Sequence, residues 1–135
     1  MKKLFTAIIT LIVLVSCSLD KNPPLTYLEP VSVISATMPE SFTYGETYQI
    51  EFTYLRPSDC HVFHDIYSVR TDNVITIAVI NSVTDNGNCQ TINAITNNSF
   101  EFLASDTGSY TFKFWQGETD DGEDIYLTME VPIEE

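Results

Sequence analysis

The fold of this chain is decided by the stretch Ser105–Gln116, which reads S-D-T-G-S-Y-T-F-K-F-W-Q. A turn signal, Asp106 followed by Gly108, leads into residues that alternate strictly in character. One parity carries the aromatic side chains of Tyr110, Phe112 and Phe114, and the other carries Thr111, Lys113 and Trp115. Because successive side chains of an extended strand point to opposite faces, the stretch predicts a β-strand with one core-facing side.

Outside this stretch, the chain after residue 30 consists of short runs of strand character separated by turn residues. The clearest is Thr47–Leu55, in which an aromatic or aliphatic residue occupies every second position. No helical period appears after residue 16. The predicted strands are Val31–Thr37, Thr47–Leu55, Cys60–Arg70, Val74–Val83, Ser99–Ala104, the strand within Ser105–Gln116, and Asp124–Val131. These runs predict an all-β fold, a seven-stranded sandwich of two sheets.

The spacing Asp106-x-Gly108-x-Tyr110 resembles the tyrosine corner of immunoglobulin-like sandwiches, in which a Tyr at the start of strand F bonds back to nearby backbone. The resemblance implies a Greek-key sandwich of the immunoglobulin-like or fibronectin-III-like kind. Phe112 stands where an antibody domain carries its second Cys, so the resemblance implies an Ig-like relative only.

The N-terminus has the pattern of an export signal, with Lys2 and Lys3 followed by the apolar run Leu4–Val15. This run is too short to span a bilayer, which needs about 20 residues. Leu14-Val15-Ser16-Cys17 resembles a bacterial lipobox. The resemblance implies cleavage before Cys17 and attachment of acyl chains such as palmitate to that residue, which together anchor a protein stably. The alternative is an ordinary signal peptide that is cut elsewhere and leaves Cys17 free.

The layout therefore resembles that of small bacterial envelope lipoproteins. It predicts a signal peptide over 1–16, a lipidated tether over 17–29 that contains Pro23-Pro24, and a sandwich domain over 30–135. No Asp directly follows Cys17, which by analogy with known sorting rules is compatible with the outer membrane. The expected location is the outer membrane or cell envelope, facing either the periplasm or the exterior.

The charge balance narrows the range of partners. The chain has 6 basic and 19 acidic residues, a net charge of −13, and removal of Lys2 and Lys3 with the signal peptide leaves −15. Such a surface repels phosphate backbones, so the sequence argues against a nucleic-acid partner. Solubility alone is an alternative explanation for the charge.

Two cysteines remain after the lipobox, Cys60 and Cys89, and in an exported protein we expect them to form a disulfide. Closing this loop stabilises the fold by about 3.6 kcal/mol in the chain-entropy model. The Asn-rich, Gly-containing stretch Thr84–Asn98 around Cys89 predicts a long loop that the disulfide restrains. A redox or nucleophilic role for Cys60 is the other possibility, but no C-x-x-C spacing accompanies it.

Two groups of residues invite a metal-site hypothesis. His61 and His64 are three apart, so on a strand their imidazoles point to opposite faces, and a packed or hydrogen-bonded His is the simpler interpretation. The segment Gly117–Asp124 is rich in acids and is a weak calcium candidate through Asp120, Asp121, Glu123 and Asp124. It does not match the EF-hand loop, and a solvated hairpin tip has the same composition.

Catalytic and cofactor motifs are absent from the sequence. There is no G-x-S-x-G and no Gly-rich phosphate loop, and two His in all leave little basis for a triad. A pair of carboxylates for acid/base work is conceivable among 19 acids, but the spacing singles none out. We therefore expect a protein that is not an enzyme and needs no cofactor.

The third predicted strand suggests a binding surface. Turning Phe63, Asp65 and Tyr67 inward would bury a carboxylate, whereas turning Val62, His64 and Ile66 inward buries only a neutral imidazole. The second arrangement places Phe63 and Tyr67 outside. In an Ig-like sandwich the C, F and G strands lie side by side, so these aromatics would join the outward residues of the last two strands. The predicted binding face comprises Phe63, Tyr67, Lys113, Trp115 and Tyr126.

An exposed aromatic patch of this kind often marks a partner surface, although the aromatics could instead be cross-strand ladder pairs or be covered by the tether or loops. The sequence thus predicts a lipid-anchored envelope binding or assembly module that recognises protein or glycan through its C-F-G face. Two alternatives stay open: a calcium-dependent adhesive module using Gly117–Asp124, and a small inhibitor of an envelope hydrolase whose loop Thr84–Asn98 plugs an enzyme cleft.

Overall fold

The computed structural model describes residues 23–135, and the secondary-structure elements within these residues are all β-strands. The strands are β1 Leu25–Val31, β2 Val33–Thr37, β3 Phe42–Thr43, β4 Thr47–Ser58, β5 His61–Thr71, β6 Val74–Asp85, β7 Thr91–Leu103, β8 Ser109–Glu118 and β9 Asp124–Glu134. The predicted all-β sandwich is confirmed, with nine strands in the described residues in place of seven. Residues 23–135 contain no helix long and apolar enough to cross a membrane. The predicted signal peptide and Cys17 lie outside the described residues.

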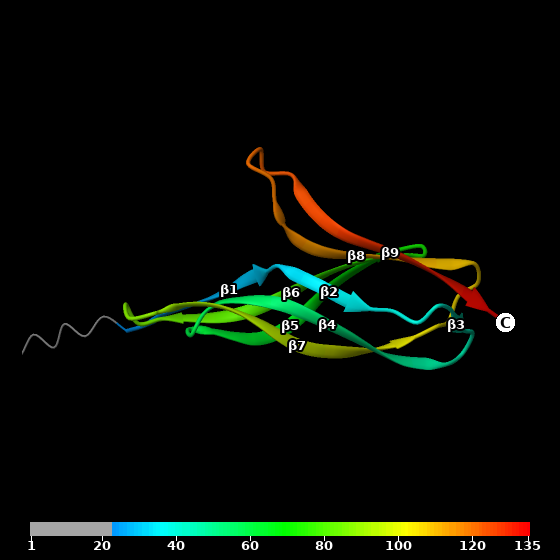
Figure 1. Ribbon diagram of the computed structural model, residues 1–135, viewed down its shortest axis with the longest axis horizontal. Helices are drawn as coiled ribbons and strands as arrows, with labels where there is room; N and C mark the ends of the chain where they lie inside the picture. The colour runs from blue at the N-terminus through cyan, green and yellow to red at the C-terminus, as the bar shows by residue number, and fades with distance from the viewer. Residues whose placement is uncertain (1–22) are drawn as a thin grey trace, which may run out of the picture.

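The two sheets differ in size (Figure 1). The smaller has the order β2-β4-β7, and the larger joins β5, β6, β1, β8, β9 and β3. Strand β6 pairs with β5 on one edge, while its other edge pairs with β8 over Val74–Ile77 and with β1 over Val79–Asp85. The β6–β8 pair is parallel, unlike the antiparallel C-F-G sheet of an immunoglobulin domain. The prediction that the third strand lies directly beside the last two is wrong, because β6 separates β5 from β8.

The core is built from the alternating runs that the sequence singled out. Tyr110, Phe112 and Phe114 of β8 have no exposed surface, and in β4 Ile50, Phe52 and Tyr54 are buried opposite them. Phe42 of the short strand β3 has ring contacts with Tyr48, Phe102, Tyr110 and Phe112, at centroid distances of 4.9 to 6.0 Å. Each such side chain contributes roughly 1.5–3 kcal/mol on burial, so this aromatic cluster is the main cohesive force between the layers.

The turn before β8 holds the hydroxyl group of Tyr110 through two hydrogen bonds. The hydroxyl donates to Asp106 Oδ2 at 2.6 Å and accepts from the Ser105 N–H at 3.1 Å. Arg70 of β5 pairs with the same Asp106 carboxylate, and its guanidinium lies 5.3 Å from the centroid of the Tyr110 ring. Gly108 adopts φ +95°, a left-handed conformation that favours glycine. These contacts give the turn the geometry of a tyrosine corner and tie it to β5.

Three boundaries differ from the sequence prediction. Leu25–Glu29, expected in the tether, belong to β1 and pair with Asn81–Asp85. The single strand expected over 31–37 is two strands, because the chain crosses from one sheet to the other at Ser32. The long loop expected over 84–98 spans only residues 86–90, since Thr91–Asn98 pair with β4. Pairing with β4 overrides the turn-like composition of this segment.

Candidate functional site

The first part of strand β5 is oriented differently from the prediction, because the strand contains a β-bulge; beyond the bulge, Ile66 packs inward and Tyr67 faces outward as predicted. The pairing register with β6 shifts between Phe63 and Asp65, so that His64 is the extra residue. Phe63 therefore packs against the core, 6.2 Å from the ring of Tyr54. Val62 is 60% exposed, and His64 and Asp65 also face outward. The bulge removes the choice between burying Asp65 and burying His64, and Phe63 is not part of an outer binding face.

The other predicted aromatic residues do come together, on the outer face of the larger sheet. Tyr67 of β5, 63% exposed, and the cross-strand pair of Trp115 in β8 and Tyr126 in β9 form the walls of a hollow of about 340 Å³. Thr76 and Ala78 of β6 line it between these walls. Ala78 is the register partner of Tyr67, and its methyl group leaves the space between the large rings unfilled. We call this hollow the aromatic groove.

The rest of the lining of the aromatic groove consists of one apolar pair and one acidic pair of residues. Pro30 of β1 and Ile80 of β6 are register partners and supply the aliphatic part. Glu118 of β8 and Asp124 of β9 are also register partners and supply two carboxylates. Strands β1 and β8 pair with different parts of the same edge of β6, β8 with Val74–Ile77 and β1 with Val79–Asp85. The groove lies where these two strands diverge from each other.

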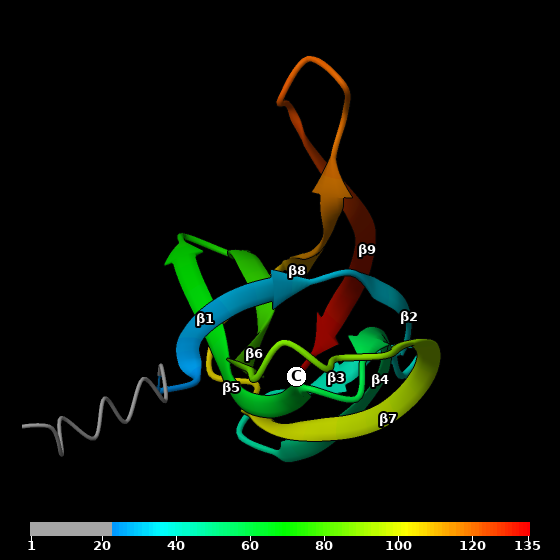
Figure 2. The same cartoon turned by 90° about the vertical axis from the view of Figure 1, so that its left-hand side faces the viewer.

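The separation of β1 from β8 is fixed by polar contacts at the strand crossing. Ser32 Oγ donates to the Gln116 carbonyl at 2.7 Å, and Gln116 Nε2 donates to the Val33 carbonyl at 3.0 Å. A register shift follows between Trp115 and Gly117, where Gly117 adopts φ +127°. Beyond this point the β8–β9 hairpin leaves the body of the sandwich and extends as an arm (Figure 2).

Asp124 holds the two aromatic walls in place. Its Oδ1 accepts from Trp115 Nε1 at 2.9 Å, and its Oδ2 accepts from the Tyr126 hydroxyl at 3.4 Å. Desolvation raises the pKa of Tyr126, and the charge of Asp124 and the hydrogen bond to it raise this pKa further. One carboxylate thus orients both rings. This role of Asp124 was not predictable from the sequence, because it depends on the register of the hairpin.

Lys113, the fifth residue of the predicted face, lies beside the aromatic groove. Its Nζ is 4.3 Å from the centroid of the Tyr126 ring, a cation–π contact on the sheet surface. Of the five predicted residues, the structure therefore brings together Tyr67, Lys113, Trp115 and Tyr126 and excludes Phe63.

The acidic segment of the weak calcium candidate forms the tip of the arm. The turn is closed by backbone bonds from Thr119 N–H to the Glu123 carbonyl and from Gly122 N–H to the Thr119 carbonyl, at 2.8 and 2.9 Å. Among residues 23–135, the carboxylates of Asp120, Asp121, Glu123 and Asp124 form no group of three or more ligand atoms within 4.8 Å of one another. In the part of the chain that the structure describes, only Asp59, Cys60 and Cys89 meet that criterion. The two sulfur atoms of that group are already bonded to each other.

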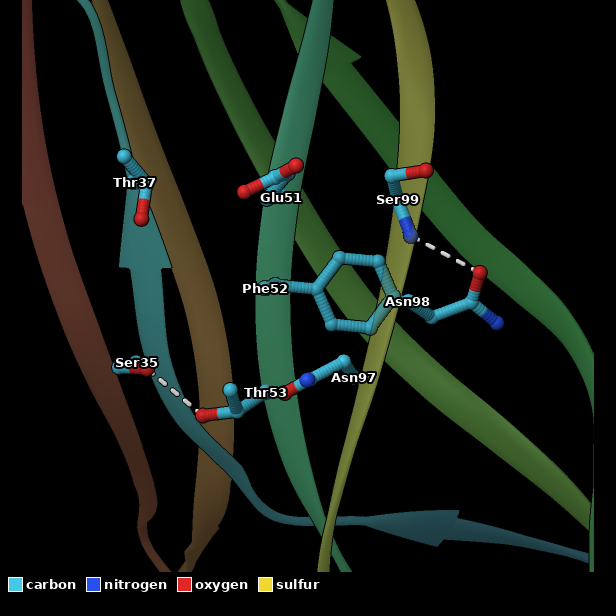
Figure 3. Close-up of a pocket in the computed structure, with 8 residues that line it drawn as sticks. All are labelled: Ser35, Thr37, Glu51, Phe52, Thr53, Asn97, Asn98 and Ser99. Carbon is cyan, nitrogen blue, oxygen red and sulfur yellow. Dashed lines mark hydrogen bonds between the residues drawn. The ribbon is translucent and has the colours of Figure 1, made fainter.

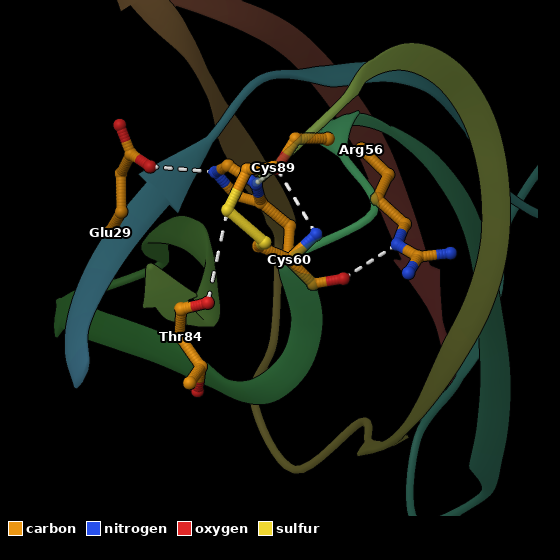
Figure 4. A network of polar contacts seen from close by, with 7 residues as sticks. Glu29, Arg56, Cys60, Thr84 and Cys89 are labelled. Carbon is orange, nitrogen blue, oxygen red and sulfur yellow. Dashed lines mark hydrogen bonds and ion pairs between the residues drawn. A yellow bond between two sulfur atoms is a disulfide. The ribbon is translucent and has the colours of Figure 1, made fainter. Parts of the chain in front are cut away.

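The predicted disulfide is confirmed: Cys60 and Cys89 are joined, with their Cα atoms 5.6 Å apart. It links the β4–β5 turn to the loop after β6, close to Glu29 of β1 (Figure 4). On its other side, Arg56 Nε donates to the His61 carbonyl at 2.6 Å. The disulfide is thus one part of a network that closes this end of the sandwich.

His61 is the centre of that network. The side chain is buried, its Nδ1 lies 2.6 Å from Ser58 Oγ, and its Nε2 lies 2.8 Å from Glu29 Oε2. This Ser-His-Glu chain was not foreseen from the sequence, because Glu29 was assigned to the tether. Ser58 Oγ also accepts from the Cys60 N–H at 3.2 Å, and Ser58 does not line the aromatic groove. The contacts join β1 to the β4–β5 turn.

A second hollow, of about 330 Å³, lies on the smaller sheet (Figure 3). Its lining is made mostly of hydroxyl and amide groups from β2, β4 and β7. Ser35 and Thr53 are hydrogen-bonded to each other at 2.6 Å, and the Ser99 N–H donates to Asn98 Oδ1 at 2.8 Å. Phe52 also lines this hollow, but its side chain is only 3% exposed. The hollow lacks the exposed aromatic surface of the aromatic groove.

Comparison of the chain with protein-family models, with curated proteins and with solved structures finds no match in any of the three.

Proposed function

We propose that this protein is a non-catalytic binding or assembly module of the bacterial cell envelope, which recognises a protein or glycan partner through the aromatic groove. The observation that carries this proposal is the convergence of Tyr67, Trp115 and Tyr126 around a hollow that small β6 side chains leave open. Aromatic side chains are enriched at recognition sites, and a pocket lined by apolar groups with a few placed polar groups is the usual form of a ligand site.

Attachment to a membrane through Cys17 belongs to the same proposal. It is supported by the lipobox pattern Leu14–Cys17 and by the export-signal pattern that precedes it. The first described strand, β1, starts at one end of the long axis of the molecule (Figure 1). A tether that leads into β1 from that end leaves the arm and the aromatic groove free to meet a partner.

The test is capture of partners from a bacterial envelope extract by three forms of the protein. These are the wild type, the double variant Trp115→Ala/Tyr126→Ala, and Tyr44→Ala as the matched control. Tyr44 is 54% exposed and is not part of the aromatic groove, so its truncation removes an exposed ring elsewhere. We expect the wild type and the control to capture the same partner and the double variant to lose it. Equal capture by all three forms would overturn the proposal.

A further inference from the structure

We propose that the aromatic groove receives an arginine side chain from a partner protein. The inference rests on the proposed function and narrows it, because it states the chemistry of the group that enters the groove. Three features of the groove carry it: two carboxylates that lie opposite each other, rigid aromatic faces beside them, and an aliphatic part formed by Pro30 and Ile80.

The charge around the groove selects for a cation. Glu118 and Asp124 line it, and the arm beyond them carries Asp120, Asp121 and Glu123. Lys113 is the basic group in contact with the Tyr126 ring, so the acidic side chains outnumber it. A potential of this sign attracts cationic groups and repels phosphate, sulfate and carboxylate ligands.

The aromatic surfaces favour a guanidinium over other cations. A guanidinium is planar, stacks on aromatic faces and forms paired hydrogen bonds with carboxylates. The ammonium of Lys113 already lies over the Tyr126 ring, which shows that a ring of this groove accepts a cation. Trp115 remains as the stronger cation–π platform, and its hydrogen bond to Asp124 orients the indole in advance.

The dimensions favour a single side chain. A hollow of about 340 Å³ is at the lower end of the range of ligand pockets, roughly 300–1,000 Å³. Pro30 and Ile80 offer aliphatic surface for the methylene stem of an arginine, which packs on apolar groups while its head stays at the carboxylates. A neutral sugar ring would match the aromatic walls but would leave the charge of Glu118 and Asp124 unpaired.

The experiment compares two tripeptide probes that differ in one charge: acetyl-Gly-Arg-Gly-amide and the same peptide with citrulline, the neutral analogue of arginine. Trp115 is the single Trp of the chain, so its fluorescence and its indole N–H resonance report on the groove without ambiguity. We expect the arginine peptide to bind about tenfold more tightly than the citrulline peptide and to weaken as salt is added. Equal affinities, or no response of Trp115 to the arginine peptide, would overturn the inference.

A pair of variants separates a groove contact from a general effect of charge. Glu118→Gln removes a charge inside the groove, and Glu123→Gln removes the same charge from the arm outside its lining. We expect the first to weaken arginine-peptide binding roughly threefold to tenfold and the second to leave it unchanged. Equal weakening by both would contradict a specific site. Identical thermal melts of the two variants establish that both are folded.

A neutral glycan probe, cellobiose, distinguishes failure of this inference from failure of the proposed function. Binding of cellobiose at Trp115 without binding of the arginine peptide would refute the arginine assignment and leave a binding groove in place. Equal partner capture by the Trp115→Ala/Tyr126→Ala variant would instead remove the proposed function itself. Binding of the arginine peptide alone supports both.

Discussion

At the scale of single residues, Asn81 of β6 is the clearest exception to the packing rules. Its side chain has no exposed surface, and neither its amide nitrogen nor its amide oxygen has a hydrogen-bond partner among residues 23–135. It lies between Val79 and Val83 on the inner face of β6, where an apolar residue belongs. A buried polar group without a partner costs about 1–3 kcal/mol.

We therefore predict that Asn81→Leu raises the free energy of unfolding by about 1–2 kcal/mol, since it keeps the shape and removes the unsatisfied groups. Asn73→Leu is the matched control, for which we expect the free energy of unfolding to fall. Asn73 Nδ2 donates to the carbonyls of Thr107 and Ser109, both at 2.9 Å, so its replacement should destabilise the turn before β8. Urea unfolding of both variants checks this, and a less stable Asn81→Leu would show that the amide does have a structural partner.

The Tyr126 hydroxyl gives a second prediction at the residue scale. Desolvation and Asp124 raise its pKa in the folded protein above the ordinary value of about 10. The unfolded chain then loses this proton first, so the contribution of Tyr126 to stability is complete below about pH 10 and is lost as the pH rises through the folded pKa.

Absorbance of the phenolate, read as the difference between wild type and Tyr126→Phe, isolates this titration. Asp124→Asn removes the neighbouring charge, so we expect it to shift the Tyr126 titration to lower pH than in the wild type. An unchanged titration in Asp124→Asn would mean that the carboxylate does not act on Tyr126. Tyr54, whose pKa is raised by burial, is present in all three forms and cancels in the comparison.

At the scale of elements, the strand network near the disulfide closes one end of the sandwich. Cys60–Cys89, the His61–Glu29 contact and the Arg56–His61 contact join β1, β4, β5 and the loop after β6. We predict that Cys60→Ala/Cys89→Ala lowers the free energy of unfolding by about 3.6 kcal/mol, because the unfolded chain regains the freedom of a 29-residue loop. Chemical denaturation of the double variant measures this. A loss below about 1 kcal/mol would show that the polar contacts hold this end without the covalent bond.

Comparison of the strands with the prediction shows which parts of the fold can be predicted from the sequence. Strict alternation in Thr47–Leu55 and Tyr110–Phe114 gave both the strands and their buried faces, because one parity was wholly apolar. Strand β5 was assigned the wrong inner face only before its bulge, where Phe63 packs inward; after it, Ile66 packs inward and Tyr67 faces outward as predicted. The bulge at His64 resets the parity and has no signature in the residues themselves. Strand β7 was partly assigned to a loop, because its Asn and Thr residues are stable as a strand only when paired with β4.

The residues of the candidate site were also predicted only in part from the sequence. The alternation pattern identified Trp115, Tyr126 and Lys113 as outward-facing, because each is next in sequence to a residue predicted to face the core. Tyr67 was placed correctly although its neighbour Phe63 was not. The contribution of Pro30 depends on β1 pairing with β6, and the role of Asp124 depends on the hairpin register, so neither followed from local sequence.

At the scale of the whole molecule, the acidic charge and the projecting arm define how a partner would approach. The net charge of −13 favours a basic partner and opposes self-association, and the arm concentrates that charge beside the aromatic groove. The sandwich itself is rigidly packed by aromatic side chains between its two layers. The proposed recognition surface is thus fixed in shape, with its acidic groups and its rings on the same side.

Quenching of Trp115 fluorescence by small solutes of different charge tests most directly whether the aromatic groove is open and acidic. Because Trp115 is the single Trp, the signal comes from the aromatic groove alone. An open acidic groove predicts that neutral acrylamide quenches the indole, and that at equal ionic strength the ratio of Cs⁺ quenching to I⁻ quenching is higher than for free N-acetyltryptophanamide. An indole shielded from all three solutes, or a ratio below that of the free indole, would contradict an open acidic groove.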